Sequence, residues 1–443
     1  MNNQPVPLLI QGGRIIDPSQ GLDEIGSLLI SDGKISWLGR GETTPPHPEY
    51  DILNAEGLIV CPGFVDLHCH LRQPGFEEKE TIATGTQAAA RGGFTTVCCM
   101  ANTNPPLDNQ AAIDYVKSTA ATEGVVRVLP IGCISKGRAG AELVEMDKLA
   151  SAGVIAFSDD GDPALNSRLM RQALDCSRDL DLPITDHCED TALTEGGVMN
   201  EGITSIRLGL RGIPNAAEDI IVARDLALAQ LTGGRLHIAH VTTEGSVDLI
   251  RRAKEKGVRV TAEVTPHHLT LTEERVTGYD TNAKVNPPLR TGRDVQALIQ
   301  GLKENVIDII ATDHAPHTEA DKRCEFALAP FGISGFETAL GSLMGLVHAG
   351  QLTLAVLIAK LTCEPSKIIK YEKLGTLAIG ALADITIFDP EREWVVDTKT
   401  FASKGKNTPW AGSVLKGMVM ATIAQGKLVY KDNSVKVEAK GKY

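Results

Sequence analysis

The stretch Phe64-Val65-Asp66-Leu67-His68-Cys69-His70 decides how the rest of the chain is interpreted. It is an apolar run of strand length that ends in two histidines spaced by one residue. Side chains two apart on a strand point to the same face, so both imidazoles can face one metal ion while Cys69 points away. A single histidine is usually a satisfied polar residue. Whether this histidine pair indicates a metal site therefore depends on whether other strands also end in residues that bind metals.

Apolar segments of strand length recur through the middle of the chain, and a helical stretch follows each of them. Strands that are apolar on both faces and alternate with helices predict a parallel sheet closed into a (β/α)₈ TIM-like barrel. An open doubly wound sheet is the alternative, but no phosphate-binding glycine fingerprint follows the first strand. The eight strand segments lie near 59–68, 94–101, 126–133, 154–158, 183–187, 235–240, 258–264 and 307–313, and examples of the helices are Glu80 to Ala90, Ala216 to Gln230, Val247 to Lys256 and Val295 to Glu304.

Both ends of the chain are β-rich. Residues 7–60 alternate short apolar runs with turn residues, as expected for short antiparallel strands, and the same texture returns at 383–388 and 418–430. A chain of 443 residues also exceeds the roughly 250–300 residues at which one core stops growing. We therefore predict a small composite β-sandwich domain from 1–59 and 373–443, with the barrel at 60–372.

Composition excludes several partners. With 44 Lys and Arg against 56 Asp and Glu, the net charge is -12, which disfavours nucleic acid and anionic membranes. The nine cysteines form no CxxC pair, and neither a signal peptide nor a long apolar run is evident. We expect a protein of the reducing cytoplasm. An anionic substrate would need local positive charge from metal ions or single arginines.

Residue types that bind metals collect where the predicted strands end. Catalytic groups of such barrels lie at these carboxyl ends, and the chain has only 11 histidines in all. Four imidazoles and two carboxylates can therefore converge, which suits two zinc ions better than one and allows an aspartate such as Asp160 to bridge them. A shared hydroxide would then be a nucleophile at neutral pH. The strand ends concerned are His68 to His70, Ser158-Asp159-Asp160, Asp186-His187, His237 to His240 and Thr312-Asp313-His314.

These residues resemble the amidohydrolase superfamily and, within it, the class I dihydroorotases of bacteria. The resemblance extends over essentially the whole chain. It is carried by Pro62 to His70, His70-Leu71-Arg72, Met100-Ala101-Asn102-Thr103, Asp186-His187-Cys188-Glu189-Asp190, Lys284-Val285-Asn286-Pro287-Pro288-Leu289-Arg290 and Ala311-Thr312-Asp313-His314-Ala315-Pro316-His317.

The resemblance implies a set of metal ligands. Asp160 is chosen over Asp159 by the family's spacing of 27 residues to His187. The implied ligands are His68, His70 and Asp313 for one zinc, His187 and His240 for the second, and Asp160 as the bridge.

The resemblance also implies substrate-binding residues. Arg72, Asn102 and Asn286 would hold a carboxylate of the substrate, for which the planar fork of an arginine is suited. His317 and the Phe331-Gly332 backbone would surround the ring, beside the ligand His70. On their own residue types, Arg72 is equally a solvated arginine, the asparagines turn residues and His317 a loop histidine.

By the same resemblance the activity is reversible hydrolysis of dihydroorotate to carbamoyl aspartate in pyrimidine biosynthesis. A bridging hydroxide would attack the ring amide carbonyl, with Asp313 as general acid and base. The alternatives are a sister enzyme, namely a hydantoinase, dihydropyrimidinase or allantoinase, and an inactive scaffold that binds aspartate transcarbamoylase. An active enzyme can also have that partner, and we expect a homodimer.

Four other features are interpreted as structural. Pro266-His267-His268 ends the seventh segment, where adjacent strand residues face opposite ways. Glu80 and Glu263 are interpreted as a helix-surface and a barrel-interior carboxylate, and Arg207 and Arg211 as parts of a solvated loop.

Overall fold

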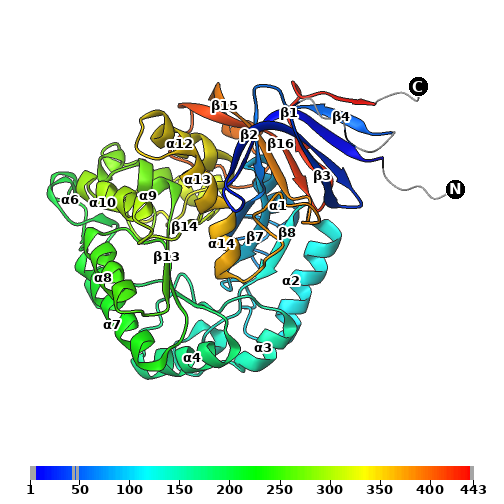
Figure 1. The fold of residues 1–443 in the computed structure, drawn as a ribbon. Helices are drawn as coiled ribbons and strands as arrows, with labels where there is room; N and C mark the ends of the chain where they lie inside the picture. Colours follow the sequence, from blue (N-terminus) through cyan, green and yellow to red (C-terminus); the bar gives the residue numbers. More distant parts are fainter. Residues whose placement is uncertain (1–5, 42–44, 46–48, 440–443) are drawn as a thin grey trace.

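Strands from both ends of the chain form one nine-stranded sheet in the computed structural model, which describes residues 6–41, 45 and 49–439 (Figure 1). The order is β17-β16-β15-β5-β1-β2-β3, and β4 pairs with both β1 and β18. Residues 1–5, 42–44, 46–48 and 440–443 of the predicted β domain lie outside the described residues. The strands are β1 (Leu8–Asp17), β2 (Leu22–Ser31), β3 (Lys34–Arg40), β4 (Asp51–Asn54), β5 (Ile59–Pro62), β15 (Ile385–Val395), β16 (Val414–Ala424), β17 (Lys427–Lys431) and β18 (Val437–Ala439).

This terminal sheet has its own apolar core, in which Ile10, Leu28 and Ile385 are buried together. β1, β2 and β3 are antiparallel as expected, but β4 and β5 pair with β1 in parallel, so the expectation of purely antiparallel strands at the N-terminal end was wrong. The reason is that β5 also pairs with β15 in antiparallel fashion, which places it between strands from opposite ends of the chain.

The predicted first strand segment, near 59–68, is two strands. β5 belongs to the terminal sheet, whereas β6 (Phe64–Cys69) begins a second, parallel sheet. Gly63 separates them, and a Cβ there would lie 2.2 Å from Thr95 Oγ1, so only glycine allows the chain to pass between the sheets at this point. The terminal sheet therefore extends to Pro62, beyond the predicted boundary at residue 59.

The parallel strands of the middle region pair in a closed ring. β6 pairs with β7 and β7 with β8, while a second sheet has the order β14-β13-β12-β9. Parallel bridges from Phe157 to Gly132 and to Ile184 join the two sheets on one side, and a bridge between Cys69 and His314 joins them on the other. The strands are β7 (Phe94–Cys99), β8 (Arg127–Pro130), β9 (Ile184–Asp186), β12 (Leu236–Ile238), β13 (Val260–Val264) and β14 (Ile309–Ile310), with a separate pair β10 (Met199–Asn200) and β11 (Gly212–Ile213).

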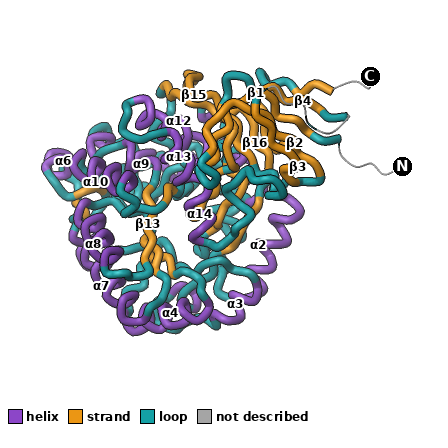
Figure 2. Tube along the Cα trace, in the orientation of Figure 1, coloured by secondary structure: helices purple, strands orange, loops and turns teal. Residues whose placement is uncertain are grey.

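Helices surround these strands, as Figure 2 shows. Several of them combine one apolar face with a capped N-terminus; in α4, for example, the Asn166 side chain accepts from Leu169 N, and Leu169 and Leu174 are buried. The helices are α1 (Ile82–Arg91), α2 (Gln110–Glu123), α3 (Met146–Ala152), α4 (Ser167–Leu180), α5 (Thr191–Thr194), α6 (Ile203–Leu208), α7 (Ala216–Thr232), α8 (Glu244–Glu255), α9 (Pro266–Thr270), α10 (Gly292–Lys303), α11 (Glu319–Lys322), α12 (Phe336–His348), α13 (Leu354–Leu361) and α14 (Cys363–Ile368).

Two other segments differ from expectation. Residues 154–158 contribute only the bridges of Phe157 instead of a full strand. Pro266-His267-His268 lies on α9, because Thr265 caps a helix there and Pro266 occupies its first turn, where a missing N–H costs nothing. All nine cysteines are free thiols. Within the described ranges, no helix is both long and apolar enough to cross a membrane.

Candidate metal centre and substrate cavity

The six side chains that the sequence predicts as metal ligands lie together at one end of the parallel strands. Each is at most 5 % exposed, and each lies between one residue before and three residues after the last paired residue of its strand. They are His68 on β6, His70 directly after β6, Asp160 after Phe157, His187 after β9, His240 after β12 and Asp313 after β14.

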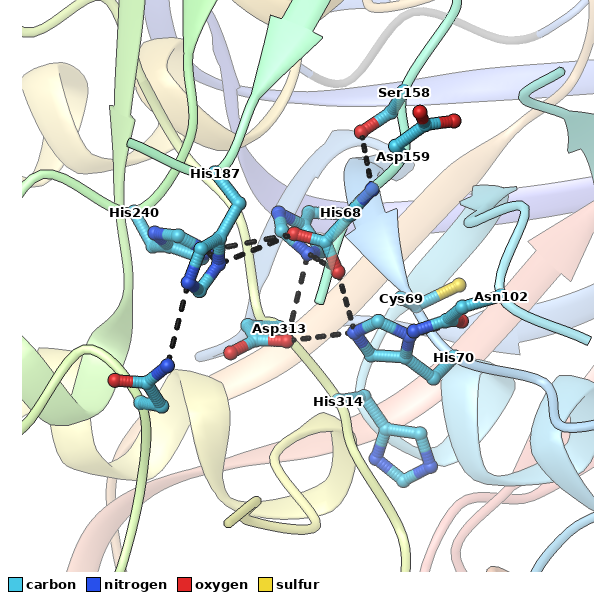
Figure 3. Close-up of polar contacts among 12 residues, drawn as sticks. His68, Cys69, His70, Asn102, Ser158, Asp159, His187, His240, Asp313 and His314 are labelled. Atoms are coloured by element: carbon cyan, nitrogen blue, oxygen red, sulfur yellow. Dashed lines mark hydrogen bonds and ion pairs between the residues drawn. The ribbon is translucent and has the colours of Figure 1, made fainter. Parts of the chain in front are cut away.

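One half of this group surrounds Asp160 Oδ2. His68 Nε2 and His70 Nε2 each lie 3.4 Å from that oxygen, and Figure 3 shows both rings beside Asp313. Asp313 Oδ1 lies 3.0 Å from His70 Nε2 and 3.5 Å from His68 Nε2. Two imidazole nitrogens and two carboxylate oxygens thus face a common point, which is a donor set that zinc accepts.

The other half surrounds the second oxygen of the same carboxylate. Asp160 Oδ1 lies 3.7 Å from His187 Nδ1 and 3.5 Å from His240 Nε2. Those two ring nitrogens are 2.9 Å apart, so a proton or a cation must lie between them. Asp160 therefore presents one oxygen to each half.

Hydrogen bonds on the outer side fix the tautomers of three histidines. His68 Nδ1 donates to Glu263 Oε1 at 2.5 Å, and His187 Nε2 donates to Glu189 Oε2 at 2.7 Å. His70 Nδ1 donates to Asn102 Oδ1 at 2.9 Å. Each ring then turns an unprotonated nitrogen toward Asp160, the arrangement that metal-binding histidines require.

Two of the inward-facing atoms have no hydrogen-bond partner. They are His68 Nε2 and Asp160 Oδ1, both fully buried. A buried polar atom without a partner is costly, and a cation at each half would supply one. The residues present therefore fit a pair of metal ions.

Glu263 is a functional candidate that the sequence did not identify, because it was interpreted only as a barrel-interior carboxylate. It is fully buried on β13, and besides His68 it contacts His237 Nε2 at 3.1 Å. Burial raises its pKa, but His68 and His237 outweigh burial and lower it to about 2. The available signal was a charged residue inside the apolar run Val260–Val264.

The two adjacent aspartates after Phe157 face different ways. Asp159 Oδ1 accepts hydrogen bonds from the backbone N–H groups of Ile134 and Ser135, and Oδ2 accepts from the Ser135 hydroxyl. Asp159 therefore stabilises a loop, and Asp160 alone lies among the histidines.

Asp313 is buried and lies within 3.5 Å of ring nitrogens of His68 and His70. Burial raises the pKa of this carboxyl, but His68 and His70 outweigh burial and hold it below its usual value. Asp313 is therefore ionised at neutral pH.

A cavity of about 160 Å³ opens beside these groups. Most of the substrate-binding residues expected from the sequence line it, and His317 lies directly behind the wall. The lining residues include His70, Arg72, Asn102, Asn286, Phe331 and Gly332, together with Asp160, His187, His240 and Asp313.

The polar groups of the cavity wall are held by the protein itself. Arg72 Nε donates to Pro316 O at 3.2 Å and Nη2 lies 3.5 Å from His317 Nε2, which leaves Nη1 for a ligand. Asn286 Nδ2 donates to Glu189 Oε2 at 2.7 Å, the same oxygen that His187 contacts. Glu189 thus links the metal side of the cavity to its substrate side, and the sequence alone did not assign it this role.

His317 is neutral. Its Nε2 lies 2.8 Å from Phe331 O and donates to that carbonyl. Burial lowers its pKa to about 3, and nearby Arg72 adds to the effect. It therefore supports the Phe331-Gly332 backbone and carries no charge toward the cavity.

Three other residues interpreted from the sequence lie outside the metal group. Glu80 is fully buried, so its assignment to a helix surface was wrong; it accepts hydrogen bonds from the Ser403 hydroxyl and from Lys404 N. His268 is held by Thr265 Oγ1 and Pro287 O. Arg207 is exposed as expected, but it lies in the last turn of α6, so its assignment to a loop was wrong.

Known proteins resemble this chain over nearly its full length. A family model described as Dihydro-orotase-like matches residues 57–246. A dihydroorotase from Pelotomaculum thermopropionicum is 53% identical over 97% of this chain and 100% of the relative. The chain belongs to the dihydroorotase family. A second family member, from Pelobacter propionicus, is 51% identical over 96% of this chain and 99% of its own length.

Solved structures share the fold of this dihydroorotase family member. The L-hydantoinase from Arthrobacter aurescens superposes with a TM-score of 0.86 at 24% identity, over 98% of both chains. A dihydropyrimidinase from Brevibacillus agri gives 0.83 at 22% identity, over 98% of this chain and 97% of its own. At these identities the likeness concerns the fold alone.

Proposed function

We propose that this protein is a zinc-dependent dihydroorotase that interconverts dihydroorotate and carbamoyl aspartate in pyrimidine biosynthesis. The observation that carries the proposal is one cavity lined by Asp160, Asp313, three histidines and Arg72, with His68 buried behind it, in a chain 53% identical to a dihydroorotase over 97% of its length. An inactive scaffold would have no reason to retain all six metal-binding side chains.

Two zinc ions are the proposed cofactors. His68, His70 and Asp313 would hold one, His187 and His240 the other, with Asp160 as the bridge. Bound zinc lowers the pKa of water and polarises a carbonyl, which is the chemistry that amide hydrolysis needs.

Asp313 is the proposed general acid and base. Since it is ionised, its carboxylate takes the proton of the attacking water and then delivers it to the departing ring nitrogen. A positioned carboxylate accelerates such a transfer by about 10²–10⁴. In the synthetic direction the same carboxylate removes a proton from the attacking amide nitrogen and passes it to the oxygen that leaves as water.

Arg72, Asn102 and Asn286 are proposed to hold the carboxylate that distinguishes dihydroorotate from plain cyclic amides. Arg72 supplies the charge: Nε donates to Pro316 O and Nη2 lies 3.5 Å from His317 Nε2, which leaves Nη1 for a carboxylate. Asn102 uses Oδ1 on His70, so its NH₂ group remains available. The Phe331-Gly332 backbone, supported by His317, would flank the ring.

We also infer that the ring of parallel pairings is the eight-stranded barrel expected from the sequence. The terminal sheet would be the composite β domain, made from 1–59 and 373–443 with β5 crossing the boundary. A homodimer of the cytoplasm is proposed with it, and aspartate transcarbamoylase is a proposed partner.

The deciding experiment compares dihydroorotate with hydantoin and allantoin as substrates of the zinc-loaded protein. Turnover of dihydroorotate at least tenfold faster than of either uncarboxylated ring is expected, because Arg72 makes a charge-assisted contact that those rings lack. Faster turnover of hydantoin would instead assign the sister activity. Zinc content measured on the same sample tests the number of sites.

The reaction equilibrium gives an independent check. Ring closure consumes a proton, because a carboxylate of carbamoyl aspartate becomes part of a neutral imide. Lower pH should therefore favour dihydroorotate at equilibrium and higher pH carbamoyl aspartate. An equilibrium ratio that stays constant between pH 6 and 8 would contradict this reaction.

A further inference from the structure

Residues 401–408, in the connection between β15 and β16, reach from the terminal sheet to the substrate side of the cavity. Two buried carboxylates anchor this segment. Glu337 Oε1 accepts from Ala402 N at 2.9 Å, and Glu80 accepts from the Ser403 hydroxyl and Lys404 N. The segment is therefore fixed to α12 and to the start of α1 before it reaches Asn407.

Asn407 is 3 % exposed, and its amide group is fully used within the protein. Oδ1 accepts from His317 N at 2.9 Å and from Ser334 Oγ at 2.8 Å. Nδ2 donates to Ala315 O at 3.1 Å and to Gly332 O at 3.0 Å. An asparagine amide has two donor and two acceptor positions, and all four are occupied here.

These four contacts join the two loop segments that form one wall of the cavity. The 315–317 segment carries His317 and the carbonyl of Pro316 that holds Arg72, and the 331–334 segment carries Phe331 and Gly332. Backbone hydrogen bonds between these two segments are few, and one of them runs from Ala315 N to Ile333 O at 2.9 Å. The side chain of Asn407 supplies contacts that a longer strand pair would provide.

The packing of this wall leaves little room for movement. Gly332 has a φ of +140°, and a Cβ there would lie 2.7 Å from Ala315 O and 3.0 Å from His317 Nε2. The two segments therefore touch at van der Waals distance, directly where Asn407 bonds both. A shift of one segment moves the other and, through Pro316, the guanidinium of Arg72.

We propose that Asn407 is a positioning residue that sets the substrate wall formed by residues 315–317 and 331–332. It is absent from the cavity lining and acts through Arg72, His317 and the Phe331-Gly332 backbone. The terminal sheet thus contributes to substrate binding through one side chain. The kinetic part of this inference rests on the proposed dihydroorotase function.

The test uses the isosteric substitution Asn407→Asp in the zinc-loaded full-length protein. The carboxylate keeps the two accepted hydrogen bonds but loses both donors and faces the carbonyls of Ala315 and Gly332. Misplacement of substrate-binding groups by about 1 Å can cost on the order of 100-fold, so we expect kcat/KM for dihydroorotate to fall about 10- to 100-fold, mostly through KM. Zinc content is unchanged, because Asn407 contacts none of the proposed ligands.

A second measurement does not depend on activity. Hydrogen–deuterium exchange should become faster in peptides covering 314–318 and 330–335, with little change around His68 and His187. The matched control is Asn200→Asp: Asn200 is also buried and hydrogen-bonded, to Glu273 and Arg290, but none of its partners lines the cavity. It should lower the melting temperature without raising KM.

The outcomes separate the two proposals. Wild-type KM and wild-type exchange in Asn407→Asp, or a rise in KM no larger than in Asn200→Asp, overturns the role of Asn407. If the wild-type protein fails to turn over dihydroorotate, the proposed function is lost, and the exchange comparison still decides whether Asn407 orders the wall. Should Asn407→Asp not fold, Asn407→Ser, which retains one donor and one acceptor, replaces it.

Discussion

The metal side and the substrate side of the cavity are built differently. On the metal side, His68, His187 and Asp313 lie at or just beyond the ends of parallel strands, so the backbone pairing itself sets their positions. On the substrate side, Arg72 and His317 lie on loops and are positioned by a few hydrogen bonds to other loops. The residues proposed for the chemical step are thus positioned by strands, whereas the residues proposed for substrate specificity are positioned by side chains that join loops.

The largest expected effect is on the metal side, from Asp313→Asn. The amide cannot take the proton, so turnover should fall by about 10²–10⁴ or more, while the circular dichroism spectrum and melting temperature change little. Steady-state kinetics at saturating dihydroorotate measure the effect. Asp308→Asn is the control, because Asp308 bonds Lys254 and Ala262 N outside the cavity. A rate within a few-fold of wild type would remove Asp313 from the mechanism.

The next effect is on metal affinity, from Glu263→Gln. The amide is a weaker acceptor for His68 Nδ1, and loss of such an outer carboxylate typically lowers metal affinity about 10- to 100-fold. Competition with a chromophoric chelator measures it. Glu218→Gln changes another buried carboxylate, which accepts from Thr242 N at 3.0 Å, and should leave zinc affinity unchanged. Equal affinity in both variants would show that Glu263 is purely structural.

On the substrate side, Arg72→Met should raise KM for dihydroorotate at least about tenfold, the cost of one charge-assisted hydrogen bond. Zinc content should stay as in wild type, which distinguishes this side of the cavity from the other. Arg207→Met, at an exposed site, is the control. Loss of zinc from Arg72→Met would contradict the division of the cavity into a metal side and a substrate side.

The smallest expected effect is a pH-dependent one at His317. Its pKa in the folded protein is about 3, below the ordinary 6.5, so protonation favours the unfolded chain. The stability that depends on the neutral ring is present above pH 6.5 and is lost as pH falls toward 3, by about 1 kcal/mol per pH unit. The difference in unfolding free energy between wild type and His317→Gln should therefore shrink between pH 6.5 and 5. A constant difference in denaturant titrations would mean that His317 is not buried as a neutral ring.

Much of the metal side could be predicted because the residues that mark each strand end are close together in the sequence. An apolar run followed by His-x-His or by Asp-His marks both a strand and its end, and such pairs place His68, His70 and His187 without knowledge of distant contacts. The same logic failed at Pro266, where a capping threonine and a first-turn proline begin a helix that the apolar pattern hides.

The supporting residues were not predictable in this way. Glu263 pairs with His68 across 195 positions of sequence, and Glu80 meets Ser403 across 323. An isolated glutamate or an asparagine such as Asn407 has no periodic pattern that reveals its partner. The terminal strands β4 and β5 show the same limit, because their direction is set by neighbours from the other end of the chain.

The ring of strands closes where its first and last members meet. Asp66 on β6 accepts from Thr312 N at 2.7 Å and from the Thr312 hydroxyl at 2.6 Å, directly beside His68 and Asp313. This join spans 246 positions of sequence. During synthesis on the ribosome, the chain therefore contains His68 long before it contains Asp313. It gains activity only when the first and last strands of the ring meet. Enzyme turnover can thus report on completion of folding at this join.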